Sequence, residues 1–176
     1  MTIVQKQCLL KYLGYYQGNV DGIWGEKSQR ATIAFQQAHG LEVDGIFGVN
    51  TENAIRKAIA EPSEDWWQDI RYFTREEFAC KCGCGYPVQM QRDVVALADR
   101  ARAHFGAPAT VVSGLRCETH NARVGGVANS RHLTGRAIDL RIQGISAVRL
   151  LDYLEAEPEV RYAYAINETN VHLDVD

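Results

Sequence analysis

An internal repeat constrains the fold of the first third of this chain. The segment Val20-Asp-Gly-Ile-Trp-Gly-Glu-Lys-Ser28 is matched 23 residues later by Val43-Asp-Gly-Ile-Phe-Gly-Val-Asn-Thr51. In each copy the Asp-Gly pair favours a turn, and a second glycine follows an aromatic residue. Ser28 and Thr51 are placed to cap the helices that follow. The repeat therefore predicts two copies of one turn-and-helix unit.

Apolar residues at helical spacing follow each copy of the repeat. They predict helices over residues 27–39 and 51–60, and a further helix over residues 3–13 precedes the first copy. Gly40 lies where a glycine commonly ends a helix. We therefore expect a small three-helix bundle over residues 1–60.

The rest of the chain predicts a second domain of mixed structure. An acidic, proline-containing stretch indicates a linker over residues 61–71, and a chain of 176 residues is long enough for two small domains. Residues 72–176 alternate between helical and strand patterns, which predicts an α+β fold with a short antiparallel sheet. The expected elements are helices over 88–105 and 145–155 and strands over 110–113, 137–142, 161–166 and 171–175.

Charge and hydropathy exclude some classes of partner. The net charge is −3, and lysine and arginine are scattered rather than grouped, so we expect no nucleic-acid partner. No stretch approaches the length of a membrane span, and the N-terminal residues lack the apolar core of a secretory signal. We expect a monomer that has no membrane partner.

Two histidines and one aspartate offer the ligands of a catalytic zinc site. They are His132, Asp139 and His172, and catalytic zinc usually has three protein ligands and one open position. Gly135 permits a tight turn between the first two. The residues after it alternate like a strand, as do residues 171–175, so two short strands could present these side chains on a common face.

The run from Ser113 to Asp139, with its core Ser-x-His-x-x-Gly-x-Ala-x-Asp, closely resembles the zinc D-Ala-D-Ala carboxypeptidase family. That family includes endolysin L-alanyl-D-glutamate peptidases and shares its fold with the hedgehog signalling domain. The resemblance covers residues 72–176. It implies that His132, Asp139 and His172 bind Zn²⁺ and that Arg116 lies in the substrate cleft. Ser130 and His120 are further candidates for substrate binding.

The repeat resembles the three-helix peptidoglycan-binding domain that often accompanies cell-wall hydrolases. This second resemblance covers nearly all of residues 1–60. Together, the two resemblances imply a zinc-dependent peptidoglycan hydrolase that cleaves stem peptides, as a D-alanyl-D-alanine carboxypeptidase or an L-Ala-D-Glu endopeptidase. A phage endolysin released by lysis would act at the cell wall without a signal peptide; export by another route or a leader already removed are the alternatives.

The catalytic base is less clearly marked. Relatives commonly have an acid three positions before the last histidine, where this chain has Thr169. Asp174 and Glu168 are the nearest acids, and both share the parity of His172 on a regular strand. We favour Asp174, while His120 is a third candidate. A non-catalytic wall-binding protein that retains the zinc site is the alternative that this departure leaves open.

Four of the five cysteines are grouped in the second domain. Cys80-Lys-Cys-Gly-Cys84 is a dense cluster, and Cys117 directly follows Arg116. In an oxidising compartment a cluster cysteine could form a disulfide with Cys117, whereas in a reducing one the four thiols could hold a structural zinc. Cys8, on an apolar helical face, is the cysteine left over.

Overall fold

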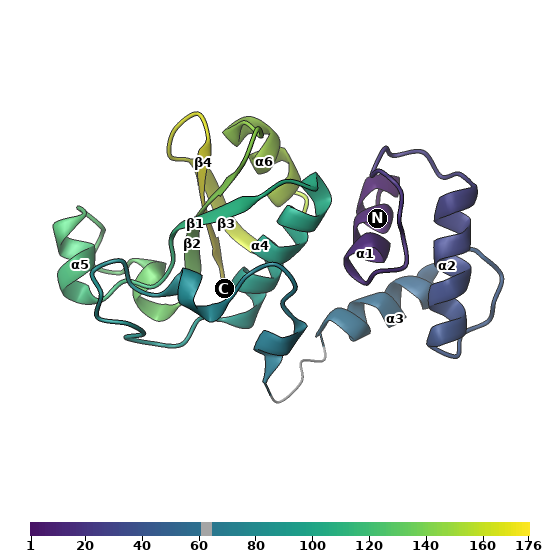
Figure 1. The fold of residues 1–176 in the computed structure, drawn as a ribbon, viewed down its shortest axis with the longest axis horizontal. Coiled ribbons are helices and arrows are strands. Elements are labelled where there is room, and N and C mark those ends of the chain that lie inside the picture. Colours follow the sequence, from purple (N-terminus) through teal and green to yellow (C-terminus); the bar gives the residue numbers. More distant parts are fainter. Residues whose placement is uncertain (61–64) are drawn as a thin grey trace. The chain divides into compact units, whose positions relative to one another are not determined.

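The computed structural model describes residues 1–60 and 65–176, and the chain forms two compact units, Met1–Asp65 and Trp66–Asp176 (Figure 1). Residues 61–64 of the expected linker lie outside the described residues. Trp66 and Trp67 belong to a 3-10 helix, η1 (Trp66–Asp69), at the start of the second unit. Their rings stack on each other at 4.5 Å between centroids.

The first unit is a bundle of three helices. They are α1 (Ile3–Tyr12), α2 (Glu26–Ala38) and α3 (Val49–Ala60). Each helix contributes one fully buried side chain to a shared core, namely Leu10, Phe35 and Ile55. Burial of these apolar side chains against one another stabilises the bundle.

Each copy of the repeat forms a loop that closes around one buried glutamine. Gln7 Nε2 donates to the Asp21 carboxylate at 2.9 Å and to the Ile23 carbonyl at 3.0 Å, and Gly22 N–H donates to Gln7 Oε1 at 2.9 Å. Gln36 makes the same three bonds with the second copy, at 2.7, 3.1 and 2.9 Å. In each copy the Asp-Gly pair thus forms hydrogen bonds with a glutamine that lies outside the repeat.

The expected helix caps at Ser28 and Thr51 are wrong. Both residues lie inside helices, and Gly25 is the N-cap of α2. Their hydroxyl oxygens accept a bond from the same amides, Ser28 from Gln7 and Thr51 from Gln36, each at 3.1 Å. Each hydroxyl is therefore a further acceptor beside the two N–H groups of a buried amide, in addition to the aspartate carboxylate and the isoleucine carbonyl.

The second unit is built on a four-stranded antiparallel sheet with the order β1-β2-β4-β3, which confirms the α+β fold class. Figure 1 shows the helices α4 and α6 against it; α4 contacts β2 and β4, and α6 contacts β3 and β4. Short helical turns and α5 connect the remaining elements. The strands are β1 (Ala109–Ser113), β2 (Ala137–Ile142), β3 (Val160–Ala165) and β4 (Asn170–Val175); the helices are η2 (Arg75–Phe78), α4 (Arg92–Phe105), α5 (Glu118–Arg123), η3 (Arg131–Thr134) and α6 (Ala147–Leu154).

Alternation along the strands separates a helix-covered face from a polar one. On β4, Val171, Leu173 and Val175 are buried, and His172 and Asp174 alternate with them. Because successive side chains point to opposite faces, these two polar residues share the face that α4 and α6 leave uncovered. The sheet register then decides which polar residues become neighbours.

One row of the sheet brings polar residues from all four strands side by side. Ser113 pairs with Asp139, Asp139 with His172, and His172 with Tyr164. These residues are distant in sequence, but antiparallel pairing places their side chains on the same face. This row forms the base of the candidate site.

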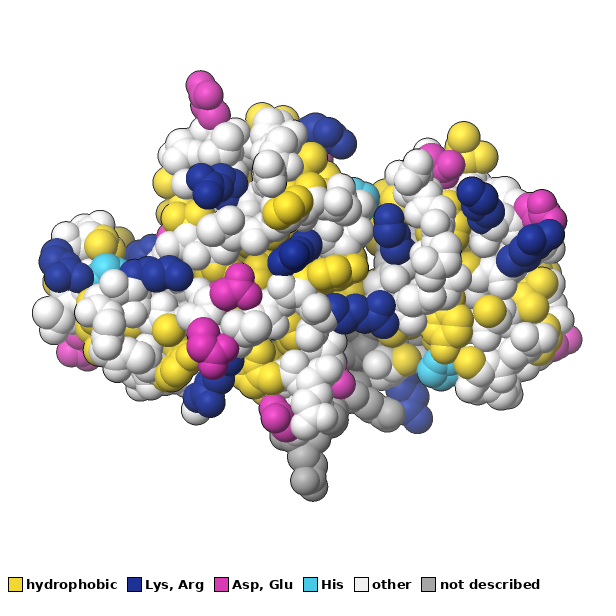
Figure 2. Space-filling model, in the orientation of Figure 1, with side chains coloured by type: hydrophobic (Ala, Val, Ile, Leu, Met, Phe, Trp, Pro, Cys, Tyr) yellow, Lys and Arg dark blue, Asp and Glu magenta, His cyan; other side chains and the backbone are white. Residues whose placement is uncertain are grey.

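The surface has a mixed character. On the face drawn in Figure 2, Lys, Arg, Asp and Glu side chains are interspersed with apolar ones in both units. Within residues 1–60 and 65–176, none of the helices has the length and apolar character that crossing a bilayer requires.

Candidate functional site

The three predicted metal ligands come together in the structure. Asp139 on β2 is paired directly with His172 on β4, and His132 is supplied by η3. Asp139 Oδ1 is 2.9 Å from His172 Nδ1 and 3.3 Å from His132 Nε2. One potential ligand atom from each residue lies within 4.8 Å of the others. This donor set and its spacing fit a single zinc ion with a position left for water or substrate.

A backbone carbonyl orients His132. The ring is buried, and its Nδ1 is 2.7 Å from the Gly114 carbonyl oxygen. Because a carbonyl can only accept, Nδ1 carries a hydrogen, and Nε2 is the nitrogen left to bind a metal, facing Asp139 and His172. Gly114 itself lies against η2, where a Cβ would stand 2.5 Å from the Phe78 carbonyl oxygen. Only glycine fits there without a backbone shift.

Arg116 holds the second oxygen of Asp139. One of its terminal nitrogens donates to Asp139 Oδ2 at 2.7 Å, and its Nε donates to Ser113 Oγ at 2.9 Å. Burial of Asp139 works against its charged form, but the bonds to His132 and His172 and the charge of Arg116 hold its pKa well below its usual range. Asp139 is therefore an anion with Oδ1 directed at the two histidines.

Asp174 lies on the other side of the His172 ring. Its Oδ2 is 3.6 Å from His172 Nε2, and its Oδ1 is 3.2 Å from a terminal nitrogen of Arg161. Since His172 Nδ1 faces Asp139, Asp174 lies beside the opposite ring nitrogen, at an ion-pair distance rather than a hydrogen-bond distance. Glu168 is exposed and lies in the turn between β3 and β4, before the regular part of β4. The strand alternation that we expected to direct it toward His172 does not reach it.

A cavity of about 870 Å³ opens over these residues. Of the predicted site residues, Arg116, Ser130 and Asp174 line it together with the three candidate ligands. His120, on α5, is not among the described lining residues. Its Nδ1 is 2.9 Å from a terminal nitrogen of Arg123, and partial burial together with Arg123 and Arg116 lowers its pKa.

Sequence reasoning missed two tyrosines at this site. Tyr162 and Tyr164 line the cavity from β3, and the Tyr164 ring lies 4.9 Å from that of His172. Burial and the charge of Asp139 raise the pKa of Tyr164. The alternation Tyr162-Ala-Tyr164 was a usable signal, because it places both rings on one face of a strand.

Fold and site together define an α+β domain with a His/Asp/His cluster in a cavity, accompanied by a separate three-helix unit. Residues 71–174 match the family described as Peptidase M15, and residues 2–55 match a peptidoglycan binding domain. The chain belongs to the peptidase M15 family.

The chain is also similar to individual proteins over different lengths. The chain is 30% identical over 147 residues to the zinc D-Ala-D-Ala carboxypeptidase of Streptomyces albus G, covering 77% of this chain and 56% of that protein. It is 41% identical over 56 residues to a spore cortex-lytic enzyme of Bacillus cereus, covering 32% and 22%. A Bacillus subtilis enzyme of the same name is 41% identical over 54 residues, covering 30% and 18%. The chain thus spans about half of the first relative and about a fifth of the other two.

Proposed function

We propose that this protein is a zinc-dependent peptidoglycan hydrolase that cleaves stem peptides. The observation that carries the proposal is the convergence of His132, Asp139 and His172 at the base of an accessible cavity. The family membership and the names of the relatives support it. Peptidoglycan is the proposed partner, and the cell wall is the proposed site of action.

The residues that line the cavity have different proposed roles. His132, Asp139 and His172 would hold zinc, which when bound polarises a carbonyl and lowers the pKa of water. Arg116 keeps Asp139 Oδ1 directed at the metal position, and its place in the cavity lining lets it also meet a substrate carboxylate or oxyanion. Ser130 lines the same cavity and is a further proposed contact for substrate.

We assign the proton-accepting role to Asp174. Among the described lining residues, Asp174 is the one carboxylate besides Asp139. The sequence offered Glu168 as an alternative, but that side chain is exposed in the β3–β4 turn. The alternative role for Asp174 is to orient the His172 ring from the Nε2 side, as carboxylates commonly do for metal-bound histidines.

The charge of the cavity suits an anionic peptide. Four arginines line it, Arg116, Arg131, Arg136 and Arg161, against two aspartates. A stem peptide presents free carboxylates near the bonds that a D-alanyl-D-alanine carboxypeptidase or an L-Ala-D-Glu endopeptidase would cut. Both specificities are consistent with this lining. An endolysin would use the same chemistry after release by lysis.

Mass spectrometry of purified muropeptides after digestion tests the proposal directly. We expect a new product, smaller by one D-alanine or split between L-Ala and D-Glu, and we expect a chelator to stop its formation. His132→Ala and His172→Ala should each abolish turnover, because each removes one of three ligands. Wild-type activity in both variants would refute the assignment. A zinc-loaded wild type that binds walls but yields no product would favour the non-catalytic alternative.

A further inference from the structure

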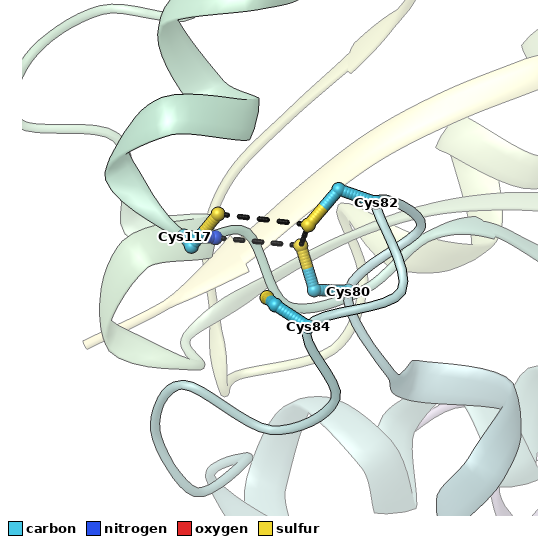
Figure 3. A group of neighbouring side chains, drawn as sticks. All are labelled: Cys80, Cys82, Cys84 and Cys117. Atoms are coloured by element: carbon cyan, nitrogen blue, oxygen red, sulfur yellow. Dashed lines mark hydrogen bonds between the residues drawn. The ribbon is translucent and has the colours of Figure 1, made fainter.

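Four cysteine side chains from two separate segments converge beside the segment that carries Arg116. Cys80, Cys82 and Cys84 lie in the turn after η2, and Cys117 is the N-cap of α5. Their Sγ atoms all lie within 4.8 Å of one another. Figure 3 shows the four side chains directed toward a common point.

The spacing of the sulfur atoms fits tetrahedral coordination. Zinc–thiolate bonds of about 2.3 Å place the sulfurs of a tetrahedral site about 3.8 Å apart. Cys82 Sγ is 3.4 Å from Cys80 Sγ and 3.7 Å from Cys117 Sγ. Because Cys82 has two neighbours at nearly the same distance, the arrangement is convergent and singles out no pair for a disulfide.

The backbone of the turn is shaped to direct three thiols inward. Cys80 N–H donates to the Gly85 carbonyl at 2.9 Å, which closes the turn. Gly83 and Gly85 have φ values of +86° and +84°, in the left-handed region that favours glycine. The turn therefore needs glycine at positions 83 and 85, next to the cysteines.

Backbone N–H groups are directed at the sulfur atoms. Cys117 N–H donates to Cys80 Sγ at 3.5 Å, and His120 N–H donates to Cys117 Sγ at 3.4 Å. Donors of this kind balance the negative charge of thiolates and are a common support around metal ligands.

We propose that Cys80, Cys82, Cys84 and Cys117 form a second zinc site with a structural role. Four thiolates would fill the tetrahedral positions and leave none for water or substrate, in contrast to the His/Asp/His site. The site would tie the cysteine turn to the segment from Ser113 to Cys117.

That segment supports the proposed catalytic centre. The Gly114 carbonyl orients His132, and Arg116 holds Asp139. Leu115 N–H donates to the Phe78 carbonyl at 2.9 Å, immediately before the cysteine turn. A metal that fixes Cys117 against this turn would therefore also restrict the segment that positions His132 and Asp139, two proposed ligands of the other metal.

The test is metal analysis of the full chain purified with a reductant and saturated with zinc before removal of the excess. We expect two zinc ions per chain in the wild type and one in the Cys82→Ser/Cys84→Ser double variant. The control Cys8→Ala, in the first unit, should keep two. His132→Ala/His172→Ala should lose the other ion and keep the one bound by cysteines, so failure of either site is recognised separately.

A spectroscopic measurement on the His132→Ala/His172→Ala variant keeps the proposal testable if the cysteine variants do not fold. Cobalt bound to four thiolates should give the intense near-ultraviolet charge-transfer absorption of sulfur ligation. The proposal is overturned if that absorption is absent, if Cys82→Ser/Cys84→Ser binds as much zinc as the wild type, or if the cluster is isolated as disulfides from reduced, zinc-supplied protein.

Discussion

At the scale of single residues, Asp139 organises the candidate metal centre. Its Oδ1 faces two histidines and its Oδ2 accepts from Arg116, so one carboxylate links three cationic or ligating groups. Asp174 likewise lies between a histidine and an arginine, His172 and Arg161. Two carboxylates with different neighbours on one face of the sheet can thus have different roles.

We predict that Asp174→Asn lowers turnover by at least about a hundredfold, the lower range for loss of a general base. The substitution keeps the shape of the side chain but removes its capacity to accept a proton. Turnover should be measured at saturating zinc, because loss of support for His172 could also weaken metal binding about 10- to 100-fold.

Glu168→Gln is the matched control for this prediction, since it makes the same chemical change at the exposed turn. We expect it to leave turnover nearly unchanged. Recovery of Asp174→Asn by added zinc would limit Asp174 to orienting His172. A severe loss in Glu168→Gln would instead assign the base to Glu168.

The sequence could indicate these side chains but not their supports. His132, Asp139 and His172 stood out because their types and strand alternation are visible in the chain. The Gly114 carbonyl that orients His132 carries no side-chain signal, and its partner is 18 residues away. The contact of Asp174 with Nε2 rather than Nδ1 of His172 likewise depends on ring orientation, which spacing does not specify.

At the scale of structural elements, the repeat loops of the first unit depend on two buried amides. Gln36 is 2% exposed and bonds the loop backbone as both donor and acceptor. Removal of the amide would leave buried polar groups of the loop without partners, at a cost of about 1–3 kcal/mol for each.

We therefore predict that Gln36→Ala lowers the free energy of unfolding of the first unit by about 3 kcal/mol, measured by urea denaturation. Gln37→Ala changes the exposed neighbour on the same helix and should stay within about 0.5 kcal/mol of the wild type. Equal stability of the two variants would show that the loops do not need this amide.

The bounds of a helix or strand could be predicted where its buried residues alternate regularly and where neighbouring residues mark its end. The strand expected over residues 137–142 is β2 with the same bounds, because its alternation is regular. The helix expected from residue 88 begins at Arg92 instead. Gln91 is extended, and its N–H donates to the Gly135 carbonyl at 2.8 Å. That long-range bond competes with the helix, and no local pattern reveals it.

At the scale of the whole molecule, the chain combines two units with separate cores. The core of the first is closed by Leu10, Phe35 and Ile55, all within residues 1–60. The second has its own sheet, helices and both candidate metal sites within residues 66–176. Units with separate cores can in principle fold and act independently. The proposed division of wall binding and hydrolysis between the two units is therefore open to experiment.

We predict that residues 1–60 alone fold and sediment with insoluble peptidoglycan. Folding should appear as a cooperative, helical thermal transition, because the core and both glutamine loops lie within the fragment. Residues 66–176 should cleave soluble muropeptides at a rate near that of the full chain but act more slowly on intact walls, since they lack the unit that raises the local concentration of enzyme at the polymer. Gln36→Ala in the fragment is the control: because we expect it to destabilise the fold, it shows whether sedimentation with peptidoglycan depends on the folded state. If the folded fragment stays in the supernatant while the intact chain sediments, recognition of the wall belongs to the peptidase unit, and the helical unit must be assigned another task.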